Sequence, residues 1–301
     1  MSVAETARTP SAEPPPSPTR SARVWRHLLR NPSGVAGLVL IVGLILVALA
    51  GPYLVHADPL KQALTQRLKG PSSGHLFGTD QLGRDILSRV VSGARISLQV
   101  GALVLLVAMT IGVTLGAIAG YVGGIVDEII MRVTDVFLAF PTLVLAMVIS
   151  AVLGKGIYNA MMAVGLVWWP WYARLVRAQV LAVKDADFIQ AARSLGASPI
   201  RIIWKHLLPS TIATITVQAS LDVGYAILAT AGLSFIGLGA QPPTAEWGAM
   251  VAEGRKYLTT HWWVPMFPGL AILLSVMGIN LLGDALRDAL DPKAPGRHRK
   301  A

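Results

Sequence analysis

Long apolar runs alternate with shorter polar segments along most of the chain. Six runs reach about 17 residues or more, the length at which a helix can cross the hydrocarbon core of a bilayer. We expect spans at residues 34–55, 97–121, 136–153, 158–175, 211–238 and 262–282. The pattern therefore predicts an all-α, polytopic membrane protein with six transmembrane helices.

The segment 187–209 is the most polar stretch between two predicted spans. Asp187 is expected to cap a first short helix, and Gly196 is expected to end it. Ser198 should then cap a second helix, which Pro209 should prevent from continuing. The sequence therefore predicts two short helices around a glycine.

The second of these helices is predicted to be amphipathic. Its basic side chains, Arg201 and Lys205, lie one helical turn apart on a polar face. Its apolar face is expected to comprise Ile200, Ile203, Trp204 and Leu207. An amphipathic element between two spans is suited to contact a partner outside the lipid.

A further amphipathic helix is predicted in the loop 56–96, where Thr79 or Asp80 can cap it. Its apolar face would comprise Ile86, Leu87, Val90, Val91 and Ala94, and its polar face Arg84, Asp85, Ser88, Arg89 and Ser92. Such a helix would lie at the membrane interface or dock on the bundle as it leads into the second span. Its polar face would meet lipid headgroups or contact the substrate directly.

Small residues in the second span indicate a close helix contact. Gly112, Gly116 and Gly120 recur every four residues, so they form one stripe along the helix. Such a stripe allows a second helix to approach closely, but it says little about chemistry.

The fifth predicted span carries polar side chains on one helical face: Thr211, Thr214, Gln218, Asp222 and Tyr225. Asp222 is ionisable and lies well inside the span, where such groups normally face the bundle interior or an aqueous path. Two interpretations remain open. The strip, in particular Thr214, Gln218, Asp222 and Tyr225, lines a translocation route, or Asp222 makes a buried structural contact, for example with Asn280.

Composition and charge support a membrane location. Hydrophobic residues make up 53% of the chain and charged residues only 14%, against about a quarter in soluble domains. The net charge is +10, and 17 of the 26 Lys and Arg residues lie in segments that an N-inside topology places in the cytoplasm. Both termini are therefore expected inside, and no basic stripe interleaved with aromatics indicates nucleic-acid binding.

The N-terminal region is expected to stay attached to the chain. Residues 1–22 are rich in Pro, Ser, Ala and Thr and are predicted to be disordered. The first apolar run follows a long basic leader and reaches spanning length, which favours an uncleaved span over a signal peptide.

No nucleotide-binding or catalytic motif is present in the sequence. It contains no Walker A motif and no HExxH, and the absence of cysteine excludes disulfides and thiolate metal sites. The chain is therefore not expected to be an enzyme or to bind a cofactor. Uphill transport would draw its energy from a partner or from an ion gradient.

The segment 187–209 resembles the EAA loop in the membrane subunits of binding-protein-dependent ABC importers. That loop reads Glu-Ala-Ala, three residues, Gly, nine residues, then Ile-x-Leu-Pro. The matching residues here are Gln190, Ala191, Ala192, Gly196, His206, Leu207, Leu208 and Pro209. Gln190 stands in place of the usual Glu, so it keeps hydrogen-bonding capacity but cannot form a full ion pair.

Three other stretches, 78–98, 232–250 and 280–292, make the chain similar to the C-type permease subunit of the dipeptide/oligopeptide/nickel importers. The resemblance implies a type I importer fold in the bacterial inner membrane, forming half a pore for short peptides or a related small solute. It further implies a homologous B-type permease, two ATPase subunits that hold ATP and Mg, and an extracytoplasmic solute-binding protein.

The same resemblance implies a division of the chain. It has a tail at 1–22, a region with the first span and outer loop at 23–96, a permease core at 97–283, and a cytoplasmic tail at 284–301. Within the core, the loop 187–209 would couple the pore to an ATPase. The alternative is a stand-alone secondary transporter or channel that uses Asp222 as an ion or proton site.

Overall fold

The computed structural model describes residues 28–55 and 57–290, and its regular structure is helical. The predicted disordered tail 1–22 and residues 291–301 of the predicted C-terminal tail lie outside the described residues. The helices are α2 (Pro32–Leu54), α3 (Ile86–Val122), α4 (Gly124–Leu138), α5 (Thr142–Leu153), α6 (Ile157–Val183), α7 (Asp187–Ser194), α8 (Pro199–Ile202), α9 (Leu208–Phe235), α10 (Trp247–Gly254) and α11 (Trp263–Leu290). Short 3₁₀ turns cover Leu64–Gln66 and Arg255–Tyr257, and a π-helical turn covers Ile203–Leu207.

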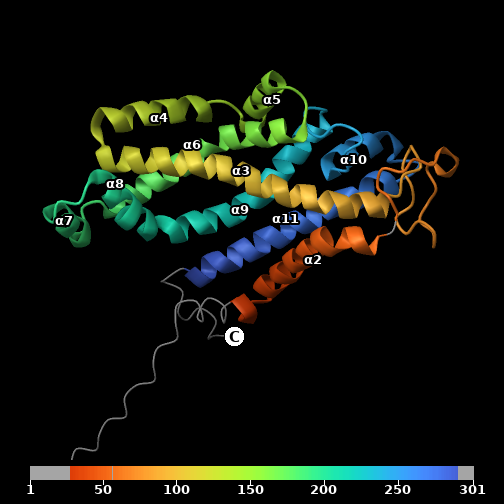
Figure 1. The fold of residues 1–301 in the computed structure, drawn as a ribbon, viewed down its shortest axis with the longest axis horizontal. Coiled ribbons are helices and arrows are strands. Elements are labelled where there is room, and N and C mark those ends of the chain that lie inside the picture. The colour runs from red at the N-terminus through yellow and green to blue at the C-terminus, as the bar shows by residue number, and fades with distance from the viewer. Residues whose placement is uncertain (1–27, 56, 291–301) are drawn as a thin grey trace, which may run out of the picture.

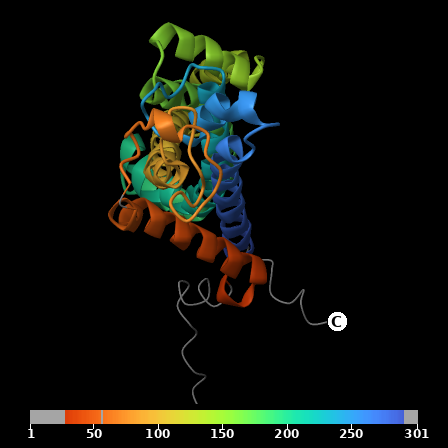
Figure 2. The same ribbon diagram turned by 90° about the vertical axis from the view of Figure 1, so that its right-hand side faces the viewer.

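The long helices α2, α3, α6, α9 and α11 form an elongated bundle (Figure 1). Helix α6 packs on α3, α5 and α9, and α11 packs on α2, α9 and α10. Helices α7 and α8 lie at one end of the bundle, whereas α10 and the loop between α2 and α3 lie at the other (Figure 1). Viewed along the bundle, α2 lies at its edge beside α11 (Figure 2).

The spanning helices agree with the sequence prediction in part. Four helical stretches are long and apolar enough to cross a membrane: Pro32–Gly51, Ile86–Val122, Pro199–Phe235 and Trp263–Ala289. Helices α4 and α5 together would make a fifth. Helix α6 contains the predicted fourth span, but its Trp, Tyr, Asn and Pro residues reduce its hydropathy, and it is not one of these stretches.

The third predicted span, 136–153, is wrong as a single straight helix. Helices α4 and α5 meet at a bend of 92°, and α4 begins at Gly124, well before the predicted start of the span at residue 136. Pro141 explains the break, because its ring lacks an N–H and disfavours helical geometry at Phe140.

The last span is longer than predicted. Helix α11 continues without interruption from Trp263 to Leu290, beyond the predicted end of the span at residue 282 and into the predicted C-terminal tail.

The glycine stripe of the second span is confirmed as the contact between α3 and α6. A Cβ atom placed on Gly112 would lie 2.4 Å from the Trp169 carbonyl oxygen, and one on Gly116 would lie 2.4 Å from the Ala173 carbonyl oxygen. Gly120 faces Val180 in the same way, at 2.9 Å. Because two of these obstacles are backbone atoms, they cannot rotate away, and only glycine permits this helix spacing.

We expect a Cβ at Gly116 to destabilise the protein and a Cβ at Gly43 to be tolerated. Gly116→Ala should reduce the free energy of unfolding by about 1–3 kcal/mol through overpacking. A Cβ on Gly43 in α2 meets nothing within 4 Å, so Gly43→Ala should be neutral or stabilise by up to about 1 kcal/mol through helix propensity. Thermal unfolding in detergent measures the stability of both variants. Equal transition temperatures would contradict the assignment of Gly116 to the close contact between α3 and α6.

Candidate functional site

The segment 187–209 begins with helix α7, whose ends follow the prediction only in part. Asp187 is the first helical residue rather than the cap; Ala186 occupies the N-cap and makes no side-chain hydrogen bond. Gly196 ends the helix as expected, with φ at +78°. Its N–H donates to Arg193 O at 2.9 Å, and the next N–H, of Ala197, donates to Ala192 O at 3.1 Å. These two bonds form a Schellman motif, which requires a residue that tolerates positive φ.

The second helix begins as predicted but does not end at Pro209. Ser198 Oγ accepts a hydrogen bond from Arg201 N–H at 3.4 Å, which confirms the cap. The chain then passes through the π-helical turn Ile203–Leu207 directly into α9, so it is helical from Pro199 to Phe235. The π-helical turn accommodates the proline. Pro209 lies in the first turn of α9 and has no N–H to donate, and the backbone hydrogen-bonding pattern has already changed in the π-helical turn that precedes it.

The buried face of this helix differs from the predicted one. Ile203 and Leu207 are buried as expected, but Ile200 and Trp204 are 71% and 59% exposed, and Ile202 is buried instead. The π turn interrupts the 3.6-residue period on which the predicted face rested. On α7, Phe188 and Leu195 are exposed as well. We call these four exposed side chains, Phe188, Leu195, Ile200 and Trp204, the apolar patch.

Two contacts fix the segment to the bundle beneath the apolar patch. Ile189 of α7 is fully buried in the same core as Val176 and Val180 of α6. The Arg193 guanidinium lies over the ring of Tyr121, at the end of α3, with 5.3 Å to the ring centroid. The segment is therefore held against both α3 and α6 while its apolar patch faces outward.

The matched residues of the loop pattern take different positions. Gln190 is exposed and donates from Nε2 to Asp185 O at 2.8 Å, so its side chain turns back to the preceding loop. Ala191 and Pro209 are exposed, His206 is half-buried and Ala192 is buried. The four residues of the apolar patch are therefore not the residues that match the loop pattern, but their neighbours in the sequence.

The polar strip of α9 lies along its contacts with neighbouring helices. Thr211 and Asp222 are buried, whereas Thr214, Gln218 and Tyr225 are half-buried. Gln218 Nε2 donates to Asp222 Oδ1 at 3.0 Å, within the same helix.

The two interpretations of Asp222 differ in their predicted partner. Asp222 bonds Gln218 rather than Asn280, whose side chain lies against Gly224, 2.8 Å from where a Cβ would be. Asp222 Oδ2 is buried and has no hydrogen-bond partner among the described residues. The Tyr172 hydroxyl of α6 lies beside this carboxyl, so an interhelical contact is available there rather than at Asn280, and both interpretations of Asp222 stay open.

Two aromatic residues of α6, Trp168 and Tyr172, belong to the surroundings of Asp222, and the sequence did not assign them to this site. The ring of Trp168 in α6 stacks on Tyr225 at 4.0 Å between centroids. Tyr172, one turn further along α6, is fully buried and its hydroxyl lies close to the Asp222 carboxyl. Their four-residue spacing around Pro170 places them on one helical face, a pattern visible in the sequence, but only the packing of α6 on α9 shows what they face.

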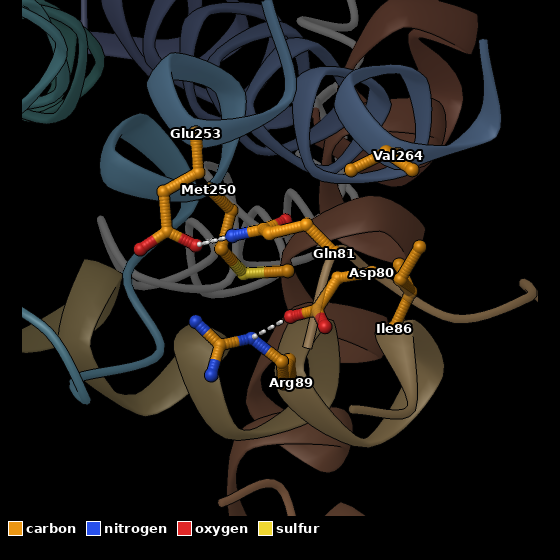
Figure 3. Close-up of a pocket in the computed structure, with 7 residues that line it drawn as sticks. All are labelled: Asp80, Gln81, Ile86, Arg89, Met250, Glu253 and Val264. Carbon is orange, nitrogen blue, oxygen red and sulfur yellow. Dashed lines mark hydrogen bonds and ion pairs between the residues drawn. The ribbon is translucent and has the colours of Figure 1, made fainter. Parts of the chain in front are cut away.

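At the opposite end of the bundle, charged side chains form a buried ionic network (Figure 3). Arg84 donates from Nε to Asp80 at 2.6 Å and from a terminal nitrogen to Glu253 of α10 at 2.9 Å. Arg89 is also buried, 3.8 Å from Asp80, and Gln81 Nε2 donates to Glu253 at 2.9 Å. The network joins the loop between α2 and α3, the start of α3, and α10.

This network corrects the predicted amphipathic helix of the outer loop. Its cap is Asp85, which accepts from Ser88 N–H at 2.8 Å; Thr79 and Asp80 lie in the preceding loop. The helix is the first part of α3. Arg84 lies just before its cap and Arg89 within its first turns, and both are buried in the network rather than placed at headgroups.

Another carboxylate at this end of the bundle, that of Glu246, serves as a helix cap. Glu246 is buried and accepts hydrogen bonds from the N–H groups of Gly248 and Ala249, at 2.9 and 2.8 Å, at the start of α10. Burial raises the pKa of the Glu246 carboxyl, and the two backbone hydrogen bonds oppose that rise.

Comparison with known proteins places these features in a family. Residues 112–294 match the model of the binding-protein-dependent transport system inner membrane component, and residues 19–71 match the N-terminal TM domain of oligopeptide transport permease C. The chain belongs to this family of transport-system membrane components. Family members of this kind are membrane subunits of transporters, so the chain is a transport permease component.

Curated relatives align along nearly the whole chain. The probable D,D-dipeptide transport system permease protein DdpC of Escherichia coli (strain K12) is 47% identical over 91% of this chain and 92% of its own length. The glutathione transport system permease protein GsiD of Pectobacterium atrosepticum is 47% identical over 89% of this chain and 90% of its length. The dipeptide transport system permease protein DppC of Escherichia coli (strain K12) is 48% identical over 89% of this chain and 92% of its own length.

A solved structure supports the fold of the family. A chain of the MetNI methionine ABC transporter in an inward-facing conformation superposes with a TM-score of 0.54, over 67% of this chain and 96% of its own. The sequence identity is 20%, so this likeness concerns the fold alone.

We expect the ionic network of this permease component to depend on Arg84. Arg84→Met removes a buried cation shared by two carboxylates, which should reduce the free energy of unfolding by about 3–5 kcal/mol. Arg132→Met is the matched control, because Arg132 pairs with Glu128 on the surface and should cost at most about 1 kcal/mol. Thermal unfolding in detergent compares them; a stable Arg84→Met variant would show that the network is dispensable.

Proposed function

We propose that this chain is one of two permease subunits of an ATP-driven importer and forms half of its pore. The solute would be a short peptide or a related small molecule, in line with the names of the relatives. Because those names include dipeptide, D,D-dipeptide and glutathione systems at similar identity, they support the class of solute rather than one compound.

The apolar patch is the observation that carries the proposed coupling to an ATPase. Its side chains are between 48% and 87% exposed and project from one end of the bundle, where the adjacent residues Arg201 and Lys205 are polar and exposed. Large exposed apolar groups within a polar surround are typical of protein–protein contacts. We infer that residues 187–209, including Gln190, Ala191, Ala192, Gly196, His206 and Pro209, form the coupling element.

The proposed topology has six spans, with α6 and the bent pair α4–α5 each crossing the membrane once. An even number of spans places both ends of the chain on one side, and the distribution of Lys and Arg favours the cytoplasm. The apolar patch then lies in the cytoplasm, and the ionic network lies outside, where a solute-binding protein would deliver its cargo.

The other subunits would supply what this chain lacks. A homologous B-type permease would complete the pore, and two ATPase subunits would hold ATP and Mg. This chain itself is proposed to bind no cofactor; among residues 28–55 and 57–290 no three His, Asp or Glu side chains are grouped to hold a metal ion.

Truncating Trp204 should weaken binding of the ATPase without unfolding the permease. A central aromatic contact typically contributes about 2 kcal/mol or more, so Trp204→Ala should weaken the affinity by about 30-fold. Trp262→Ala is the matched control, because Trp262 is 49% exposed at the opposite end of the bundle. The permease is purified in detergent and titrated with its ATPase subunits, and the dissociation constant is measured for each variant. Equal dissociation constants for Trp204→Ala and Trp262→Ala would refute the coupling assignment.

A second candidate function, a stand-alone secondary transporter or channel, is favoured by the buried ionisable side chain of Asp222 inside α9. The two functions differ in what drives uptake. We expect proteoliposomes with the complete importer and binding protein to take up solute only with internal ATP, and liposomes with this chain alone to show no uptake. Uptake by the single chain that is lost in Asp222→Asn would favour the secondary transporter instead.

A further inference from the structure

Helix α7 is attached to the rest of the bundle at few points. It has eight residues and buries only two of their side chains, those of Ile189 and Ala192. Residues 184–186 join its start to the end of α6, and Ile189 packs in the core that contains Val176 and Val180 of α6. Because a helix this short is not stable alone in water, such attachments decide where it lies. These attachments hold the first half of α7 against α6.

The second half of α7 is held by Arg193. Its side chain follows that of Ile189 by one helical turn, so the two lie on the same face of the helix. The guanidinium lies over the ring of Tyr121, with 5.3 Å to the ring centroid. Within residues 28–55 and 57–290 it forms no ion pair with a carboxylate. An arginine is always charged in proteins and stacks on aromatic faces, so the contact with Tyr121 is favourable.

Tyr121 belongs to the closely packed pair α3 and α6. It lies in the last turn of α3, next to Gly120. A Cβ atom on Gly120 would lie 2.9 Å from Val180 of α6 and 3.0 Å from the Arg177 carbonyl oxygen, so the two helices touch at this level. Tyr121 is half-buried and packs against the core that contains Val180. Arg193 therefore rests on a residue that moves only when α3 and α6 move together.

The segment 187–209 is consequently attached to two different rigid elements. Its first half is tied to α3 through Tyr121, whereas its second half continues without a break into α9. Gly196, with φ at +78°, separates the two halves. The apolar patch has two members on each side of this glycine, Phe188 and Leu195 before it and Ile200 and Trp204 after it. A partner that covers the whole patch would therefore hold both elements.

We propose that Tyr121 is a positioning residue, which holds Arg193 so that α7 moves as one body with α3 and α6. The use of this contact in transport rests on the proposed function, in which an ATPase binds the apolar patch and displaces it. The displacement then acts on α3 and α6 through α7, and on α9 through α8. Without the ring of Tyr121, α7 pivots about Ile189, and the displacement reaches the bundle mainly through α9.

The distance between two spin labels tests this contact. The chain contains no cysteine, so Leu106→Cys and Ser194→Cys place one label on α3 and one on α7. Both positions are exposed, and Leu106 lies about 22 Å along α3 from Tyr121, a separation suited to pulsed electron paramagnetic resonance. The full chain is measured in lipid nanodiscs, alone and assembled with its ATPase subunits. Because α7 follows α3, ATP should change the mean distance by no more than about 1 Å.

Variants at Tyr121 isolate the contribution of the ring. In Tyr121→Leu the distance distribution should broaden in the chain alone, and ATP should shift its mean in the assembly by about 2–5 Å, the size of helix shifts in switching transitions. Tyr121→Phe keeps the ring face and should restore the original behaviour. Tyr257→Leu is the matched control, because Tyr257 lies under Lys256, with 5.2 Å to the ring centroid, at the other end of the bundle.

Equal distributions for Tyr121→Leu and Tyr257→Leu would overturn the proposal, and so would an ATP-dependent shift while the Tyr121 ring is intact. Arg193→Gln tests whether the guanidinium binds the ATPase instead. We expect the Kd for the ATPase to change by less than about twofold, and a Kd weakened about tenfold would assign Arg193 to that interface. If the ATPase does not bind the unsubstituted chain, the proposed function fails, whereas the width of the distribution in the chain alone still tests the contact.

Discussion

The close approach of α3 and α6 is the constraint on which most of the structure depends. Where Gly112 and Gly116 lack a side chain, backbone atoms of α6 fill the space, so the two helices can neither slide nor rotate without a clash. At about 1.5 Å per residue, the 37-residue helix α3 is about 55 Å long, well beyond the membrane core. Its first turns enter the ionic network through Arg89, and its last turn meets Arg193 of α7. The pair therefore forms one rigid body between the two ends of the bundle.

Helix α9 is a second rigid element, and its continuity at Pro209 has a mechanical consequence. A break at the proline would have isolated the apolar patch from the polar strip. Instead the π turn Ile203–Leu207 absorbs the missing hydrogen bond, and the helix runs unbroken from Pro199 past Asp222. A displacement imposed at Trp204 is therefore passed to the strip, provided that α9 can move against α6.

Several features set by neighbouring residues could be predicted from the sequence, although the cap at Asp187 and the helix end at Pro209 were predicted wrongly. Features set by distant residues could not be predicted. The Gly196 C-cap, the Ser198 cap and the glycine stripe depend on local geometry, and the structure confirms all three. The burial of Arg84 depends on Glu253, 169 positions away, so an amphipathic pattern alone placed it at the surface. The cluster around Asp222 was incomplete for the same reason: its aromatic half comes from α6, and no period within α9 indicates it.

Buried polar atoms lie where α6 and α9 meet, and this location has an energetic meaning. An apolar contact between α6 and α9 would be most stable closed, and any movement would expose surface that water or lipid solvates poorly. Among the described residues, Asp222 Oδ2, Tyr172 Oη and Trp168 Nε1 are buried there without a well-formed hydrogen bond, which makes the closed contact less stable than its area suggests. Water that entered on opening would hydrate these groups. The same atoms that weaken the resting arrangement therefore reduce the cost of separating the helices, which is what the proposed pore lining by α9 requires.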